Sequence, residues 1–156
     1  MVVAEDRPPT QKRIVQVGQH HRKATEMIIT TAAAYCLALN VYFEARGEEP
    51  DAMYMIAEVV MERAYTAGYP KDICAIVWQH GQFSWTEDGK SDKPKDDIAW
   101  LQAQIVANEV LLYGSEFNTG ATHYATRDSH PYWAADMDVV GMYGNHIFYR
   151  KKGCDE

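Results

Sequence analysis

The chain has 156 residues, enough for one domain that buries a core of its own. Apolar residues make up 47% and charged residues 24% of the chain, as in ordinary globular proteins, and the net charge is −7. Because residues 1–30 hold five basic and only three acidic side chains, the rest is acidic, which argues against non-specific binding to nucleic acid.

The first segment divides into a polar part and an apolar run. Residues 1–26 contain Pro8 and Pro9 and lack sustained periodicity, which predicts an N-terminal arm or linker before a domain of residues 27–152. The apolar run from Met27 to Val41 follows a basic stretch and superficially resembles an export signal or anchor. Because it is too short to span a bilayer, we interpret it as a core helix and expect no stable membrane insertion.

A strongly apolar helix is predicted from residues 30–31, where either threonine can serve as N-cap, to Gly47. Near its end a carboxylate, Glu44, stands between aromatic residues and shares one helical face with Leu37, Asn40 and Val41. Desolvation in a core-lined cleft raises the pKa of a carboxyl group, which makes Glu44 a candidate general acid. The alternative is that Glu44 pairs with Arg46 or Arg63 and only completes the core.

Three further helices are predicted along the chain. The second runs from Pro50 to about Ala64 and is broken at residues 68–70. A short helix from Asp72 to about Gln79 precedes a long polar loop, residues 81–95. The last helix is predicted to begin at Asp96 or Asp97, either of which can cap it, and to end at Gly114.

From Ser115 onward the pattern changes to short, β-prone, alternating segments. Residues 120–125 and 146–149 read as strands or extended segments, separated by glycines and Pro131. The predicted fold class is therefore a helix-rich α+β domain whose long loop walls a groove.

The three cysteines have no metal-ligand spacing. Cys36 and Cys74 stand among apolar residues and are predicted to be small buried thiols, whereas Cys154 lies in a polar tail. A disulfide is possible, but nothing in the sequence requires one.

Aromatic and polar residues gather in the predicted loops, where binding residues concentrate. Aromatic faces and short polar side chains suit a sugar ring, whereas an acidic body cannot hold an anionic polymer by charge. For Phe83, packing against the core is the favoured interpretation. The candidate binding residues are Gln82, Phe83, Ser84, Trp85, Thr122, His123, Tyr124, Trp133, His146 and Tyr149.

Other catalytic chemistries lack their motifs. The six histidines include no HExxH pattern and no paired spacing, so no metal or other cofactor is expected. A nucleophilic serine is unsupported as well, because no GxSxG motif is present.

The chain carries an ordered series of motifs, namely residues 36–48, 57–60, 69–70 with Cys74, 82–85, 120–124, Pro131 with Trp133, and Gly144 with 146–149. These motifs, which span Tyr35 to Tyr149, resemble those of the SleB-type cell wall hydrolases, which include spore-cortex-lytic enzymes and phage endolysins. The resemblance implies a lysozyme-like fold and cleavage of the MurNAc–GlcNAc β-1,4 bond of peptidoglycan, with Glu44 as general acid. One departure is Glu62-Arg63, where the family usually has Asn-Arg.

Glycosidases usually employ two carboxylates, but only Glu44 is well placed in this sequence. One acid suffices if the substrate supplies its own nucleophile, so we expect lytic transglycosylation, in which the 6-hydroxyl of MurNAc closes a 1,6-anhydro ring. Hydrolysis by water is the alternative. The possible second carboxylates are Glu48, Asp51, Glu87 and Asp128.

A non-catalytic wall-binding or virion module on the same scaffold is a further alternative. The expected partner is the peptidoglycan glycan strand, bound by a monomer. Because no export signal is recognised, we expect the protein to accumulate in the cytoplasm until it is released to the cell wall, as a phage endolysin is.

Overall fold

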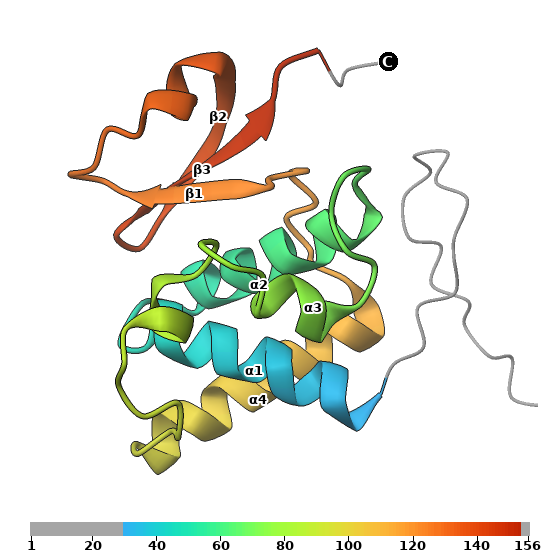
Figure 1. Ribbon diagram of the computed structural model, residues 1–156, viewed down its shortest axis with the longest axis vertical. Coiled ribbons are helices and arrows are strands. Elements are labelled where there is room, and N and C mark those ends of the chain that lie inside the picture. The colour runs from blue at the N-terminus through green and yellow to red at the C-terminus, as the bar shows by residue number, and fades with distance from the viewer. Residues whose placement is uncertain (1–29, 154–156) are drawn as a thin grey trace, which may run out of the picture.

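Four helices lie beneath a small antiparallel sheet in the computed structural model, which describes residues 30–153 (Figure 1). This arrangement confirms the helix-rich α+β fold predicted from the sequence. The predicted N-terminal arm, residues 1–26, lies outside the described residues, as does Cys154. The arm and the domain boundary therefore stay predictions.

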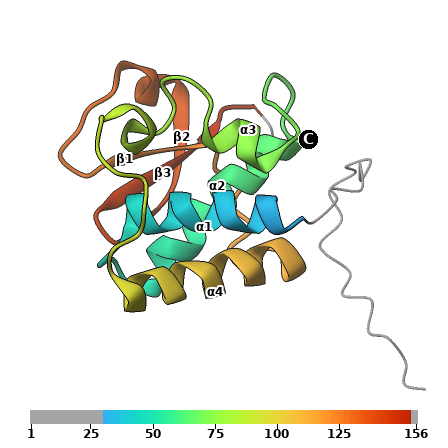
Figure 2. The same ribbon diagram turned by 60° about the horizontal axis from the view of Figure 1, so that its bottom comes forward.

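Helix α1, Thr31–Ala45, runs through the centre of the helical layer. It begins where predicted, because the side chain of Thr30 accepts a hydrogen bond of 3.0 Å from the backbone N–H of Ala33. It contacts all three other helices, and Leu37 and Val41 are fully buried (Figure 2). The described part of the apolar run thus lies in a core helix, and no helix within residues 30–153 is long and apolar enough to cross a membrane.

The other helices surround α1 and match their predicted positions. They are α2, Pro50–Tyr65, α3, Ile73–Val77, and α4, Asp97–Tyr113. The side chains of Asp72 and Asp96 cap α3 and α4 by accepting hydrogen bonds from the third backbone N–H that follows. Between α3 and α4 the predicted long loop is irregular apart from one 3₁₀ turn, η1, Ser84–Glu87.

The sheet holds β1, His123–Thr126, β2, Met137–Tyr143, and β3, His146–Lys151, in the order β1-β3-β2. Both pairings are antiparallel, and His123 faces Tyr149 across β1 and β3. A second 3₁₀ turn, η2, Tyr132–Asp136, precedes β2. Strands β1 and β3 lie where extended segments were predicted, whereas β2 was not predicted. Its pairing with β3 is interrupted by an irregularity between Val139 and Gly141.

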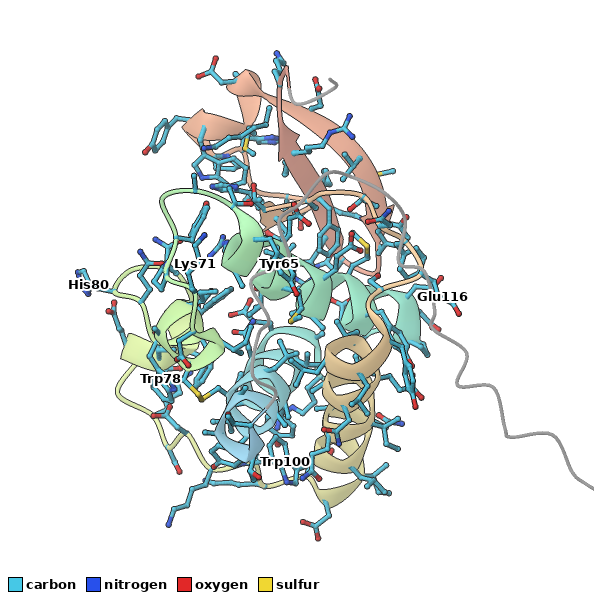
Figure 3. The ribbon with its side chains drawn as sticks, turned by 90° about the vertical axis from the view of Figure 1, so that its right-hand side faces the viewer. Tyr65, Lys71, Trp78, His80, Trp100 and Glu116 are labelled. Atoms are coloured by element: carbon cyan, nitrogen blue, oxygen red, sulfur yellow. A yellow bond between two sulfur atoms is a disulfide. The ribbon has the colours of Figure 1, made fainter. Side chains whose placement is uncertain are left out.

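The prediction of free thiols is wrong for Cys36 and Cys74, which form a disulfide between α1 and α3 (Figure 3). Their Cα atoms are 5.2 Å apart, within the range that a disulfide requires. Because the two residues are 38 positions apart, only the packing of α3 against α1 reveals that they meet.

Candidate active site

The end of α1 fixes the long loop to the helical layer. The hydroxyl oxygen of Tyr42 accepts hydrogen bonds of 3.1 Å from the backbone N–H groups of both Lys95 and Asp96. It also accepts a bond of 2.8 Å from the guanidinium of Arg46. Tyr42 and Arg46 therefore hold the last residues of the loop beside the helix that carries Glu44.

Glu44, the penultimate residue of α1, is partly buried. Its Oε2 atom accepts a hydrogen bond of 2.9 Å from the hydroxyl of Tyr124 in β1. Burial raises the pKa of Glu44, while the Tyr124 hydrogen bond and the charge of Arg63 oppose this rise without cancelling it. A carboxyl group that keeps its proton to higher pH is suited to general acid catalysis.

Arg63, near the end of α2, is the cation that acts on Glu44. Its side chain is 4% exposed, and its Nε–H donates a hydrogen bond of 2.8 Å to the backbone oxygen of Thr122. A second bond of 3.2 Å runs from Nη1 to the side-chain oxygen of Gln82. The guanidinium also lies over the Phe83 ring, 5.2 Å from its centroid. Arg63 thus joins the long loop to the strand side of the site.

A cluster of aromatic rings connects the loop to α1. Trp85 stacks on Phe43 with 4.8 Å between ring centroids and meets Trp78 edge-on at 5.0 Å. The indole N–H of Trp85 donates a hydrogen bond of 2.9 Å to the side-chain oxygen of Asn40. Trp85 is only 6% exposed, so its ring supports the loop and leaves Trp78, 43% exposed, as the accessible tryptophan of this cluster (Figure 3).

On the strand side, His123 is bracketed by Thr122 and Trp133. The Thr122 hydroxyl lies 2.9 Å from Nδ1 of His123, and the His123 and Trp133 ring centroids are 5.0 Å apart. Burial, together with the charges of Arg63 and Lys151, lowers the pKa of His123 to about 4. The imidazole is therefore neutral near physiological pH.

Glu48, the last residue of the sequence motif, holds the turn between β2 and β3. Its Oε2 atom accepts a hydrogen bond of 2.8 Å from the backbone N–H of Asn145, and Oε1 lies 3.4 Å from Nδ1 of His146. Burial lowers the pKa of His146, and Glu48 opposes that effect. The ring of His146 meets the ring of Tyr124 edge-on, with centroids 5.3 Å apart. Through its contact with His146, Glu48 therefore supports the position of Tyr124.

The other carboxylates considered as second catalytic groups lie elsewhere. Glu87 pairs with His80, which points into solvent (Figure 3). Asp51 lines a separate cavity together with Tyr54 and Glu109. Asp128 is exposed in the turn that follows β1. The charged side chain that acts on Glu44 is accordingly a cation, Arg63.

The structure brings Phe83 and His146 against Tyr124, with ring centroids 6.4 and 5.3 Å away. His123, Tyr149 and Trp133 instead pack on one another, on the face of the sheet opposite to Tyr124. The predicted binding residues also differ in accessibility. Five have little exposed surface and frame the site: Phe83, Trp85, Thr122, His146 and Tyr149. The others are exposed or partly exposed: Gln82, Ser84, His123, Tyr124 and Trp133.

Three residues of the site were not among the predicted ones. Asn40 was assigned to the same helical face as Glu44 but was given no function. Arg63 was considered only as a possible ion-pair partner of Glu44. Trp78 was not singled out, because a tryptophan at a helix end gives no sign of which face it exposes. Within residues 30–153 no group of His, Cys, Asp or Glu side chains is arranged to hold a metal ion.

Comparison with known proteins supports the motif-based resemblance. The model of the family described as Cell Wall Hydrolase matches residues 47–149, a range that begins three residues after Glu44. The spore cortex-lytic enzyme of Halalkalibacterium halodurans is 27% identical over 113 residues, which are 72% of this chain and 33% of that protein. The chain thus spans about a third of the length of this curated relative.

Two solved structures share the fold at 19% sequence identity. The catalytic domain of the germination-specific lytic transglycosylase SleB from Bacillus anthracis has a TM-score of 0.66, covering 78% of this chain and 97% of that one. The catalytic domain of Bacillus cereus SleB has a TM-score of 0.63, covering 80% and 94% respectively. These matches confirm the lysozyme-like fold that the resemblance implied.

Proposed function

This chain belongs to the cell wall hydrolase family, and from that premise we propose that it cleaves the β-1,4 glycosidic bond between MurNAc and GlcNAc in peptidoglycan. The observation that carries the proposal is the Tyr124–Glu44 pair. One oxygen of a partly buried carboxyl group accepts a hydrogen bond of 2.9 Å, and burial raises the pKa of that group. A carboxyl group of this kind can protonate a glycosidic oxygen.

The glycan is proposed to contact the accessible predicted residues of the long loop and of the strand region. Trp133 offers an aromatic face to a sugar ring, while Gln82 and Ser84 offer hydrogen-bonding groups. Neutral His123 can donate or accept a hydrogen bond without adding charge. Recognition by such groups suits an uncharged sugar face and fits a chain with a net charge of −7.

For the reaction itself we favour lytic transglycosylation. Glu44 donates its proton to the glycosidic oxygen, the bond from that oxygen to C1 of MurNAc breaks, and positive charge develops at C1. The Glu44 carboxylate then accepts the proton of the MurNAc 6-hydroxyl, whose oxygen bonds to C1 and closes a 1,6-anhydro ring. No second carboxylate is needed, which agrees with Arg63 being the charged neighbour of Glu44.

Hydrolysis is the second candidate, since a water molecule in place of the 6-hydroxyl would give a reducing MurNAc end. Mass spectrometry of digested sacculi separates the two reactions, because anhydro products are lighter by one water. Digests that contain only reducing ends would refute transglycosylation while leaving Glu44 as the acid.

The role of Glu44 is tested with Glu44→Gln, which keeps the size and the acceptor oxygen but not the acidic proton. We expect the rate of sacculus clearing to fall by at least about 10²-fold, the lower range for general acid catalysis. Glu109→Gln, which alters a carboxylate bonded to Tyr54, is the matched control. Clearing by Glu44→Gln at a rate similar to the control would contradict the proposed function.

The proposed setting is release from the cytoplasm to the cell wall, as for a phage endolysin. The cytoplasm keeps thiols reduced, whereas disulfides persist outside it. The disulfide between Cys36 and Cys74 therefore fits a protein that acts outside the cytoplasm. Alkylation of free thiols in intact producing cells and after release should label these cysteines only before release. Equal labelling in both samples would contradict this setting.

A further inference from the structure

The two faces of the sheet have different surroundings. Successive residues of a strand point to opposite faces, so Tyr124 and its cross-strand partner Phe148 share one face. This face turns toward the helices, because the Tyr124 hydroxyl bonds to Glu44 and Phe148 is fully buried. The adjacent residues His123 and Tyr149 pair with each other and share the opposite face, which we call the outer face. The outer face therefore points away from Glu44.

An aromatic platform stands on the outer face. The ring of Trp133, from η2, meets Tyr149 edge-on with centroids 5.2 Å apart and lies against His123 at 5.0 Å. These contacts hold the indole in place and cover Tyr149, while Trp133 itself stays partly exposed. Tyr132, the preceding residue, is 93% exposed. An indole held beside a free phenol offers flat apolar surfaces with polar edges, on which a sugar ring can pack.

Beside this platform the outer face continues as an apolar strip. Val139 of β2 lies opposite Tyr149, and Met142 lies opposite Ile147 of β3. Val139 and Met142 are 62% and 59% exposed, and Ile147 is partly exposed. Side chains that face each other across neighbouring strands touch, so these residues form one surface and are not scattered. A continuous exposed apolar surface of this kind marks a contact site for another molecule.

The charge at the end of the strip indicates which molecule fits. Lys151 follows Tyr149 by two residues on β3, so it belongs to the outer face, and it is exposed. The Nζ of Lys152 donates a hydrogen bond of 3.1 Å to the backbone oxygen of Ala135, which places a second cation beside η2. Asp136 offsets one of these charges, so a net positive charge remains here in a chain whose net charge is −7. A partner with carboxylates matches this end of the face.

We propose that the outer face is a second binding surface for peptidoglycan, on the other side of the sheet from Glu44. A sugar ring packs on Trp133 and Tyr132. The stem peptide that this sugar carries lies along the apolar strip, with a carboxylate beside Lys151. Peptidoglycan joins a sugar, the methyl groups of alanine and carboxylates in one polymer, and these match the three features of the face.

This inference rests on the proposed function, in which peptidoglycan is the substrate. A second contact adds affinity for the wall without occupying the residues around Glu44. It would keep the enzyme on the same sacculus between one cleavage and the next.

The test measures cosedimentation with purified sacculi in the Glu44→Gln background. Tyr132→Ala and Lys151→Glu alter exposed side chains and leave the core intact. The matched controls are Tyr113→Ala, which removes another exposed tyrosine, and Lys90→Glu, which makes the same charge change in the long loop. Each protein is tested on intact sacculi and on sacculi whose stem peptides an amidase has removed.

We expect Tyr132→Ala to weaken binding to both kinds of sacculi about fivefold, as for an aromatic contact residue. Lys151→Glu should weaken binding about fivefold on intact sacculi only, and added salt should reduce this loss. Cleavage of a soluble tetrasaccharide of GlcNAc and MurNAc by Tyr132→Ala with Glu44 retained should match that by wild type, because so short a chain is held beside Glu44 alone.

Tyr132→Ala binding as tightly as Tyr113→Ala would overturn the inference. Equal losses by Lys151→Glu on intact and stripped sacculi would refute the contact with the stem peptide. A wild-type dimer that Tyr132→Ala converts to a monomer, with unchanged binding to sacculi, would assign the outer face to a second copy of the chain instead. Failure of the proposed function is distinguishable from these results, because it appears as digestion of sacculi by Glu44→Gln and not as a change in binding.

Discussion

Substitution of Gly144 by alanine tests whether Glu48 holds the turn between β2 and β3. Gly144 has φ of +54°, and a Cβ atom added there would lie 1.7 Å from Oε2 of Glu48 and 2.9 Å from Cβ of Ala52. The same Oε2 accepts the bond from the backbone N–H of Asn145. Alanine therefore cannot be accommodated unless the carboxylate leaves this N–H.

The expected cost has two parts. A left-handed conformation costs an alanine about 1–2 kcal/mol. Loss of the hydrogen bond from the Asn145 N–H to a charged group costs about 1.5–3 kcal/mol more. Together we expect Gly144→Ala to lower the free energy of unfolding by about 2.5–5 kcal/mol, a fall in Tm of roughly 10 °C for a chain of this size. Gly89, with φ of +72° and nothing within 4 Å of the added Cβ, should show only the first part.

Urea unfolding of both alanine variants gives the comparison. A third variant, Glu48→Ala, removes the obstructing carboxylate, so the additional cost of Gly144→Ala should shrink in that background, leaving the contact with Ala52. A Gly144→Ala variant no less stable than Gly89→Ala, or one whose cost is the same with and without Glu48, would show that Glu48 does not hold this turn.

The remaining predictions concern the disulfide and two titrating groups. Cys36→Ser should lower the free energy of unfolding by about 4 kcal/mol, because the disulfide closes a loop between cysteines 38 positions apart. Guanidinium unfolding with and without reductant measures this loss. A wild-type protein whose unfolding is unchanged by reductant would contradict the prediction. Glu44→Gln should be more stable than the wild type at neutral pH but not at acidic pH. Because folding raises the pKa of Glu44, the wild type loses stability as the pH rises from 4.5 through the folded-state pKa. Equal Tm values of the two proteins at neutral pH would contradict this prediction. His123 has a pKa of about 4 in the folded state against 6.5 when unfolded, so stability should fall as the pH drops from 6.5 to 4. His123→Phe should flatten this part of a curve of Tm against pH. An unaltered curve would show that His123 is not the group responsible.

The helices were predictable because their signals are local. Thr30 and Asp96 cap helices through hydrogen bonds to the third residue after them, which a sequence displays directly. The strand β2 was not predictable in the same way. Its residues alternate only weakly, and their pairing depends on β3, which lies beyond a turn held by Glu48. The disulfide likewise depends on contact between two helices and not on any local pattern.

The sequence alone led to Glu44 as the candidate acid, which stays a prediction, but it did not separate residues that bind substrate from residues that support the site. Glu44 could be assigned to an apolar face by helical spacing alone. Trp85 and Tyr149 were predicted to bind substrate, yet they are only 6% exposed each. An aromatic residue in a loop motif has the same sequence signature whether it contacts a ligand or supports a residue that does. Burial, which separates the two cases, is decided by the packing of the loop on α1.

The proposed reaction explains why opposing influences meet at Glu44. In the first step the group must carry a proton, and burial, which raises its pKa, favours that form. In the second step it must act as a carboxylate and accept a proton, and both the Tyr124 hydrogen bond and the charge of Arg63 favour this form. Burial alone would leave a strong proton holder that donates poorly, and the cation alone would leave a carboxylate with no proton to give. A group that acts first as an acid and then as a base within one catalytic cycle needs both influences. Loss of the Arg63 charge or of the Tyr124 hydrogen bond would therefore disfavour the carboxylate form of Glu44 that the second step requires.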